Sequence, residues 1–177
     1  MFDLDHALKA LTGHIDWLTA WPALSGVAYL FAVSPRLALI DIRERRLPNK
    51  LVLPGFIVTF AGQSLAAAEN ADTAARIALA LISASVTFGF GLVANLKNQI
   101  GMGDVKLFAL ISYSTAWFSV ALPLVALGLA CSSGATQIAF SALKSRALQL
   151  RGTIAFGPHL LVGFALSPLA FLVSNLG

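Results

Sequence analysis

The chain has 177 residues, of which 58% are hydrophobic and only 11% are charged. A soluble domain of this length carries roughly a quarter charged residues, so the composition excludes an ordinary water-exposed globule. Disorder is excluded as well, because so apolar a chain cannot stay solvated and unfolded. The single cysteine, Cys131, rules out an internal disulfide framework and a zinc module built from several cysteines.

Apolar stretches separated by polar breaks run along the chain and predict its organisation. A membrane helix takes about 20 apolar residues, so six of them would use about two-thirds of this sequence. The stretches are residues 17–40, 51–68, 74–96, 105–140, taken as two short spans that turn near 117–123, and 158–176. We therefore predict an all-α, polytopic membrane protein with about six transmembrane helices. Residues 1–177 form a single membrane-embedded domain in this interpretation, with residues 1–16 as a short non-cytoplasmic segment.

The basic residues support this count. With six spans, the polar stretches 43–50, 97–106 and 144–151 lie on one side of the membrane. They hold nine of the 12 basic residues, namely Arg43, Arg45, Arg46, Lys50, Lys97, Lys106, Lys144, Arg146 and Arg151. Cytoplasmic loops carry such an excess, so these three loops are expected in the cytoplasm. A bilayer partner thus explains the net charge of +4, and no nucleic acid is needed.

Two acidic residues, Asp41 and Asp104, are not explained by this topology. Each is expected where a span meets a cytoplasmic loop, Asp41 ending the first helix and Asp104 opening the fourth. Charged residues near membrane depth are costly and usually face a protein interior or a wet cavity. One interpretation is a helix cap or a partner for a neighbouring basic residue, and the other is a functional acid.

The sequence Gly101-Met102-Gly103-Asp104 places an acid after two glycines in an apolar protein. Glycine frees the backbone from helical geometry and lets another chain approach closely. We expect the backbone to leave helical geometry at Gly103, so that an extended peptide can reach Asp104. The alternative is a helix-entry turn with Asp104 as the N-terminal cap, for which aspartate is favoured.

Two motifs in this chain resemble the signatures of the prepilin peptidases, which are membrane aspartic proteases of the Gly-x-Gly-Asp class. The first motif is Asp41 followed by Leu47-Pro48-Asn49, and the second is Gly101-Met-Gly-Asp-Val-Lys-Leu107. The resemblance implies that Asp41 and Asp104 are the two catalytic residues. It also implies a pilin-like precursor as the substrate, cleaved at the cytoplasmic face of the inner membrane.

A third stretch, Phe156-Gly157-Pro158, is similar to the carboxy-terminal Pro-Phe-Gly-Pro of the same family. Ala155 stands where that pattern often has proline, and His159 where it commonly has an apolar residue. Long members of the family carry two Cys-x-x-Cys pairs, which this chain lacks. The resemblance therefore implies the short, peptidase-only form associated with tight-adherence (Flp-type) pili, with no methyltransferase domain, no zinc and no cofactor.

Five further residues of these motifs each have a structural and a functional interpretation. Pro48 and Asn49 either form a turn and helix cap into the second span or shape the cleft. Lys106 either extends to the membrane surface or neutralises charge in the site. Gly157 and Pro158 either start the last helix or line the site.

Three functions stay open at this point, and the first is a membrane endopeptidase. It would use one carboxyl to activate water and the other to protonate the carbonyl oxygen. The second is a small proton-coupled transporter, which would place its acids near the middle of the membrane. The third is an inactive scaffold for pilus assembly. The sequence leaves the identity of the substrate and the oligomeric state undetermined.

Overall fold

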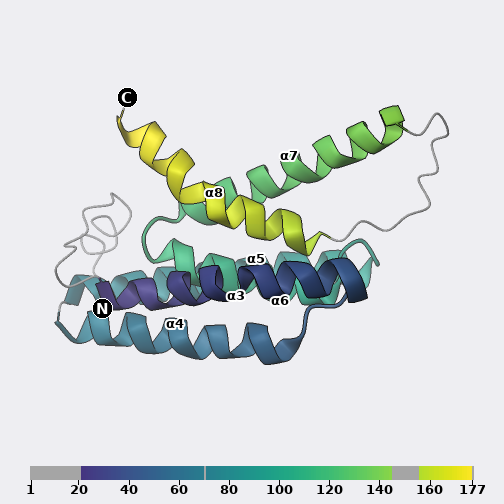
Figure 1. Cartoon of the computed structure of the whole chain (residues 1–177). Helices are drawn as coiled ribbons and strands as arrows, with labels where there is room; N and C mark the ends of the chain where they lie inside the picture. The colour runs from purple at the N-terminus through teal and green to yellow at the C-terminus, as the bar shows by residue number, and fades with distance from the viewer. Residues whose placement is uncertain (1–20, 70, 145–155, 177) are drawn as a thin grey trace.

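A computed structural model of the chain describes residues 21–69, 71–144 and 156–176 (Figure 1). Within these ranges the chain is helical throughout, apart from short turns. A short 3-10 turn, η1 (Trp21–Ala23), precedes six helices: α3 (Leu24–Glu44), α4 (Asn49–Glu69), α5 (Ala71–Leu96), α6 (Met102–Ala116), α7 (Ala121–Lys144) and α8 (Gly157–Leu176). The prediction of an all-α chain with six helices is confirmed. The predicted segment 1–16 and most of the basic loop 144–151 lie outside the described residues.

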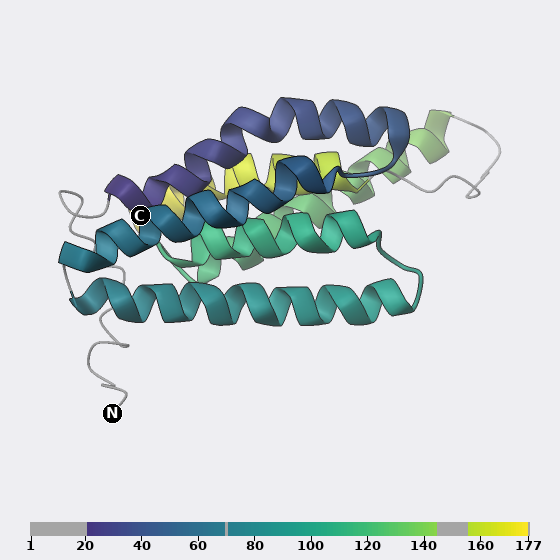
Figure 2. The same cartoon turned by 90° about the horizontal axis from the view of Figure 1, so that it is seen from below.

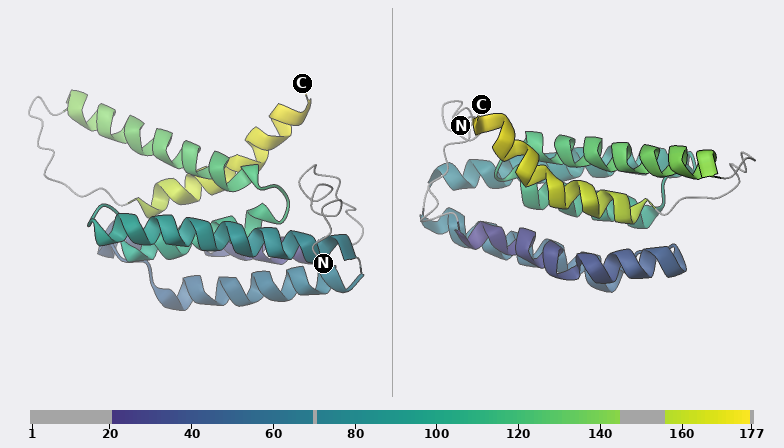
Figure 3. Two further views of the ribbon diagram at one scale, coloured as in Figure 1. Left: turned by 180° about the vertical axis from the view of Figure 1, so that it is seen from behind. Right: turned by 45° about the horizontal axis from the view of Figure 1, so that its top comes forward.

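The helices form two layers. The first contains α3, α4, α5 and α6, and each of these helices runs opposite to the one before it in the chain (Figures 1 and 2). The second contains α7 and α8, which pack on each other and cross the first layer at an angle (Figure 3). This alternation brings the α3–α4 turn, the α5–α6 turn and the start of α8 to the same end of the bundle.

The outer surface of the bundle is apolar, and its largely apolar interior also holds several buried polar side chains. Ile57, Phe90 and Leu124 are 71%, 76% and 68% exposed. Thr59 and Gln63 of α4 are buried, and their side chains bond the Ser114 hydroxyl and the Tyr113 carbonyl oxygen of α6, each at 3.1 Å. Polar contacts of this kind hold helices together in lipid, where apolar burial drives no association.

Four of the described helices are long and apolar enough to cross a membrane, and they belong to α3, α4, α5 and α7. The protein is a polytopic membrane protein. Helix α6 is the exception in length, because its 15 residues span about 22 Å, less than a hydrocarbon core of about 30 Å. Nearly all of it from Leu107 onward is buried, so α6 is the central helix of the bundle.

Several helix boundaries differ from the predicted ones, and one break agrees. The first helix continues through Asp41 to Glu44, and α5 begins at Ala71 instead of 74. The break between the predicted stretches 51–68 and 74–96 is therefore taken up almost entirely by α4 and α5. The predicted turn near 117–123 is confirmed, since α6 ends at Ala116 and α7 starts at Ala121.

Candidate active site

Asp41 lies in the last turn of α3, and its side chain is only 5% exposed. The helix is closed by Arg45, which has φ 51° and donates its backbone N–H to the Asp41 carbonyl oxygen at 2.9 Å. A left-handed residue at this position is the usual way to end a helix, although glycine is the usual residue. The reversal fixes the last turn of α3 and points the chain back toward α4.

Asp104 lies in the first turn of α6. The turn is opened by Gly101, whose φ of −68° and ψ of 142° are extended, and the Gly101 carbonyl accepts the Val105 N–H at 3.2 Å. The interpretation of Asp104 as the N-terminal cap is therefore wrong, because Gly101 holds that position and Asp104 comes three residues later. From its place in the first turn of α6, the Asp104 carboxyl faces back toward the backbone amide of Gly101.

Gly157, the first residue of α8, lies between the two carboxyl groups. A Cβ atom built on Gly157 would be 2.6 Å from Asp41 Oδ2 and 3.3 Å from Asp104 Oδ1. The two oxygens are therefore at most the sum of these distances apart, 5.9 Å. The backbone amide of Gly157 also faces the Asp41 carboxyl. Three segments far apart in sequence thus meet at one point.

The same two oxygens, Asp41 Oδ2 and Asp104 Oδ1, are buried and have no hydrogen-bond partner among the described residues. A buried carboxyl oxygen without a partner is expensive and needs an explanation, of which a catalytic role is one. Two carboxyls this close do not both ionise readily, so the pair can hold one shared proton. Such a pair offers an acid and a base at once.

A family model for the type IV leader peptidase family matches residues 26–139 of the chain, a range that contains both aspartates. The chain belongs to the type IV leader peptidase family. Neither the curated proteins nor the solved structures provide a match. The resemblance drawn from the two aspartate motifs is thereby confirmed, and the protein is a prepilin-peptidase-type membrane protease. Gly157 and Pro158 lie beyond the matched range.

A polar pocket of about 330 Å³ opens beside the two aspartates of this leader peptidase. Both aspartates line it, together with Gly103, Asn49 and Lys106 from the sequence-derived candidates. Lys106 donates from Nζ to Asn49 Oδ1 at 3.1 Å, which ties the start of α4 to the first turns of α6. Lys106 thus lines the pocket beside the two aspartates, and Asn49 accepts its hydrogen bond.

Gly103 does not act as expected. It lies within α6, so the backbone does not leave helical geometry there, and the extended residue is Gly101. A Cβ atom on Gly103 would be 2.9 Å from Leu47 Cβ and 3.3 Å from the Leu47 backbone nitrogen. The absent side chain lets the α3–α4 turn pack against α6, which brings the last turn of α3 beside Asp104.

The two prolines of the motifs fit their structural interpretation. The Pro48 carbonyl accepts the backbone N–H groups of Leu51 and Val52, at 3.0 and 3.3 Å, and so opens α4. Pro158 is the second residue of α8, where its missing N–H costs no helical bond. Neither proline lines the polar pocket.

Sequence reasoning missed what holds α8 against α7 next to this pair of aspartates. His159 contacts Ser133 through Nδ1 at 3.0 Å and Gln137 through Nε2 at 2.5 Å. These bonds fasten the first turn of α8, and with it Gly157, to α7. His159 stood out in the sequence as a departure from the family pattern, which was the available signal.

Proposed function

We propose that the protein is a membrane aspartic endopeptidase that removes the leader peptide from type IV pilin-like precursors, with Asp41 and Asp104 as its catalytic residues. The observation that carries the proposal is the pair of carboxyl oxygens that have no hydrogen-bond partner among the described residues and lie at most 5.9 Å apart beside Gly157. Family membership supports the peptidase class, and the pair supplies the chemistry.

In the proposed mechanism, the ionised carboxyl takes a proton from a water molecule, which attacks the scissile carbonyl carbon. The protonated carboxyl donates its proton to the carbonyl oxygen. In the second step, the carboxyl that took the proton from water donates it to the leaving nitrogen as the C–N bond breaks, and the other carboxylate takes a proton from a hydroxyl of the intermediate, so that the pair again holds one proton. The described residues bring together no group of three or more histidine, cysteine, aspartate or glutamate side chains that could hold a metal ion.

The polar pocket gives the substrate backbone a path to the pair. Asn49 and Lys106 present an amide and an ammonium group at its wall, beside both aspartates. We assign Lys106 to positioning: it holds Asn49 and the start of α4, and it places positive charge near the site. A peptide carbonyl or carboxylate of the precursor entering this pocket would meet these donors.

We place the end of the bundle that holds the two aspartates at the cytoplasmic face of the inner membrane. The α3–α4 turn and the α5–α6 turn, which are both rich in basic residues, lie at this end. In a Cys131→Ser background, Gln99→Cys should resist a membrane-impermeant thiol reagent added outside intact cells, and Ala121→Cys at the opposite end should react. Both positions are exposed, so accessibility of the side chain does not limit the reaction. Reaction of Gln99→Cys alone would reverse the orientation.

The direct test of function is co-expression of the chain with candidate pilin-like precursors. We expect a shortened product on gels, and mass spectrometry of that product should give a new amino terminus at a single peptide bond. A host without its own prepilin peptidase is the control for endogenous cleavage. Intact precursors in every pairing, with the protein present in the membrane, would contradict the proposal.

A further inference from the structure

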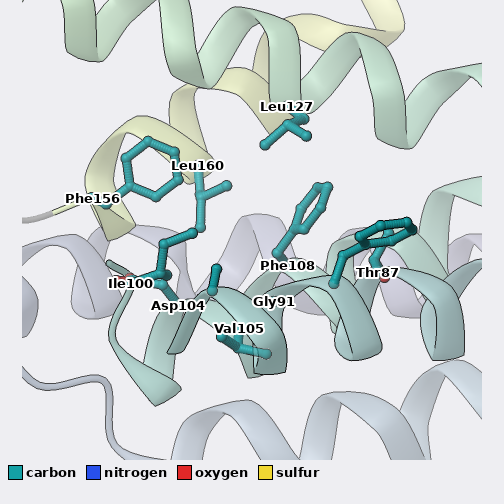
Figure 4. Close-up of a pocket in the computed structure, with 11 residues that line it drawn as sticks. Thr87, Gly91, Ile100, Asp104, Val105, Phe108, Leu127, Phe156 and Leu160 are labelled. Atoms are coloured by element: carbon teal, nitrogen blue, oxygen red, sulfur yellow. The ribbon is translucent and has the colours of Figure 1, made fainter. Parts of the chain in front are cut away.

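The first turn of α8 contacts the carboxyl pair on one side and α7 on the other. Gly157 lies between the two carboxyls, and its backbone amide faces Asp41. Phe156 and Leu160 bracket the same turn, and the Phe156 carbonyl oxygen accepts the Leu160 N–H at 3.1 Å. Together with residues of α5, α6 and α7, they line an apolar pocket of about 150 Å³ beside Asp104 (Figure 4). The first turn of α8 is therefore a wall of the proposed catalytic centre.

The polar contacts that hold this turn come from α7. His159 follows Gly157 by two residues, and both of its ring nitrogens are engaged. Nδ1 lies 3.0 Å from the Ser133 hydroxyl, and Nε2 donates to Gln137 Oε1 at 2.5 Å, since an amide oxygen only accepts. Ser133 and Gln137 are four residues apart, so they lie on one face of α7, one turn from each other. Two contacts restrain both the position and the rotation of the ring.

One turn further along, α8 lies directly against the backbone of α7. A Cβ atom built on Gly163 would be 2.9 Å from the Ala130 backbone nitrogen and still closer to the Ala126 carbonyl oxygen. Such a close approach fixes how far α8 can slide along α7. Among the described residues, none that lines the polar pocket belongs to α7. We therefore expect Ser133 and Gln137 to affect the two carboxyls through α8.

We infer that His159 is a positioning residue of the carboxyl pair: through Ser133 and Gln137 it holds the first turn of α8 on α7, and so keeps the Gly157 amide directed at Asp41. This inference rests on the proposed function, because it concerns cleavage at the two aspartates. An N–H directed at a carboxyl favours its ionised form. Since one carboxyl of the pair must be ionised, the place of this amide helps to set the pH at which the pair becomes active.

The test starts from α7 and leaves His159 unchanged, with a pilin-like precursor that the wild-type enzyme cleaves. Ser133→Ala and Gln137→Met each remove one of the two contacts. Each should lower the cleavage rate by about ten-fold, less than the cost of about hundred-fold for a full displacement by 1 Å, because the other contact remains. Gln137→Glu keeps the acceptor oxygen and should retain most of the activity. Ser132→Ala is the matched control, because the Ser132 hydroxyl bonds the Gly128 carbonyl oxygen of its own helix at 2.8 Å, and it should cleave at the wild-type rate.

The pH profile of kcat/KM separates positioning from a plain loss of folded protein. When the Gly157 amide moves away, the pair ionises less readily, so the acidic limb should move to higher pH by roughly half a unit to one unit. A smaller folded fraction lowers the rate by the same factor at every pH. Ser133→Ala changes no titratable group at the polar pocket, whose other charged side chains are Arg45, Arg46 and Lys106.

His159→Ala removes both contacts and should lower the rate by about a hundred-fold. Adding Ser133→Ala to this variant should lower the rate no further, because Ser133 acts through His159. Losses that multiply in the double variant would show that Ser133 acts by another route, and would overturn the inference.

The inference would also be overturned by wild-type rates in both Ser133→Ala and Gln137→Met. A lower rate with an unmoved acidic limb would contradict it too, since His159 would then contribute to packing alone. Each of these results leaves the proposed function intact, because cleavage at the aspartates continues. If the wild-type enzyme cleaves no precursor, the proposed function and the role of His159 are both overturned.

Discussion

Asp41→Asn and Asp104→Asn should each lower the cleavage rate of a pilin-like precursor by at least about a hundred-fold, the usual contribution of one general acid or base. Asparagine keeps the size and shape of the side chain but can neither take nor hold the proton that the pair must share. The two oxygens that would act are buried and lack partners among the described residues, so no neighbour is available there to take over. Cleavage should be followed by the appearance of shortened precursor over time.

Both variants should still fold and enter the membrane. Asparagine matches aspartate in size and has no charge to bury, so the melting temperature of the purified protein should not fall. Glu44→Gln is the matched control, because Glu44 is an exposed acid in the same last turn of α3 as Asp41. It should cleave at the wild-type rate. Activity above about a tenth of wild type in either aspartate variant would contradict the shared-proton mechanism.

The parts of the site that could be predicted from the sequence are those encoded by local motifs. Asp41 and Asp104 were selected because acids at span ends are costly and because the surrounding residues follow a recognisable pattern. The number of helices follows from the lengths of the apolar stretches and from the basic loops. Six spans place all three basic loops on the same side of the membrane. These features depend on residues close together in the chain.

The parts that could not be predicted depend on contacts between distant segments. Nothing in the sequence around Gly103 indicates that Leu47 packs against it, so closely that a Cβ atom on Gly103 would be 2.9 Å from Leu47 Cβ. The local sequence therefore predicts only backbone freedom at this glycine. The apolar pocket beside Asp104 is similarly built from four helices and has no motif. The left-handed Arg45 was also unexpected, because the sequence offers no glycine where α3 ends.

Gly157→Ala should lower the cleavage rate by about a hundred-fold, the effect expected when catalytic groups move by about 1 Å. The new Cβ would be 2.6 Å from Asp41 Oδ2, closer than nonbonded atoms approach, and 3.3 Å from Asp104 Oδ1. The atoms in its way are the ends of two side chains, which can rotate aside. The backbone therefore keeps its place while the carboxyl pair is pushed out of its arrangement.

Stability and activity should consequently separate in this variant. Alanine is a better helix former than glycine, so the melting temperature of the purified Gly157→Ala protein should stay close to that of wild type. Gly134→Ala is the matched control on the α7 surface that faces α8: its new Cβ would meet its nearest atom, in His159, at an ordinary 3.8 Å. That control should cleave normally. Wild-type cleavage by Gly157→Ala would mean that the carboxyl oxygens are not held at this glycine during the reaction. A fall in melting temperature that matches the fall in rate would instead assign Gly157 to packing alone, because only a role at the carboxyl pair lowers the rate of a protein that remains folded.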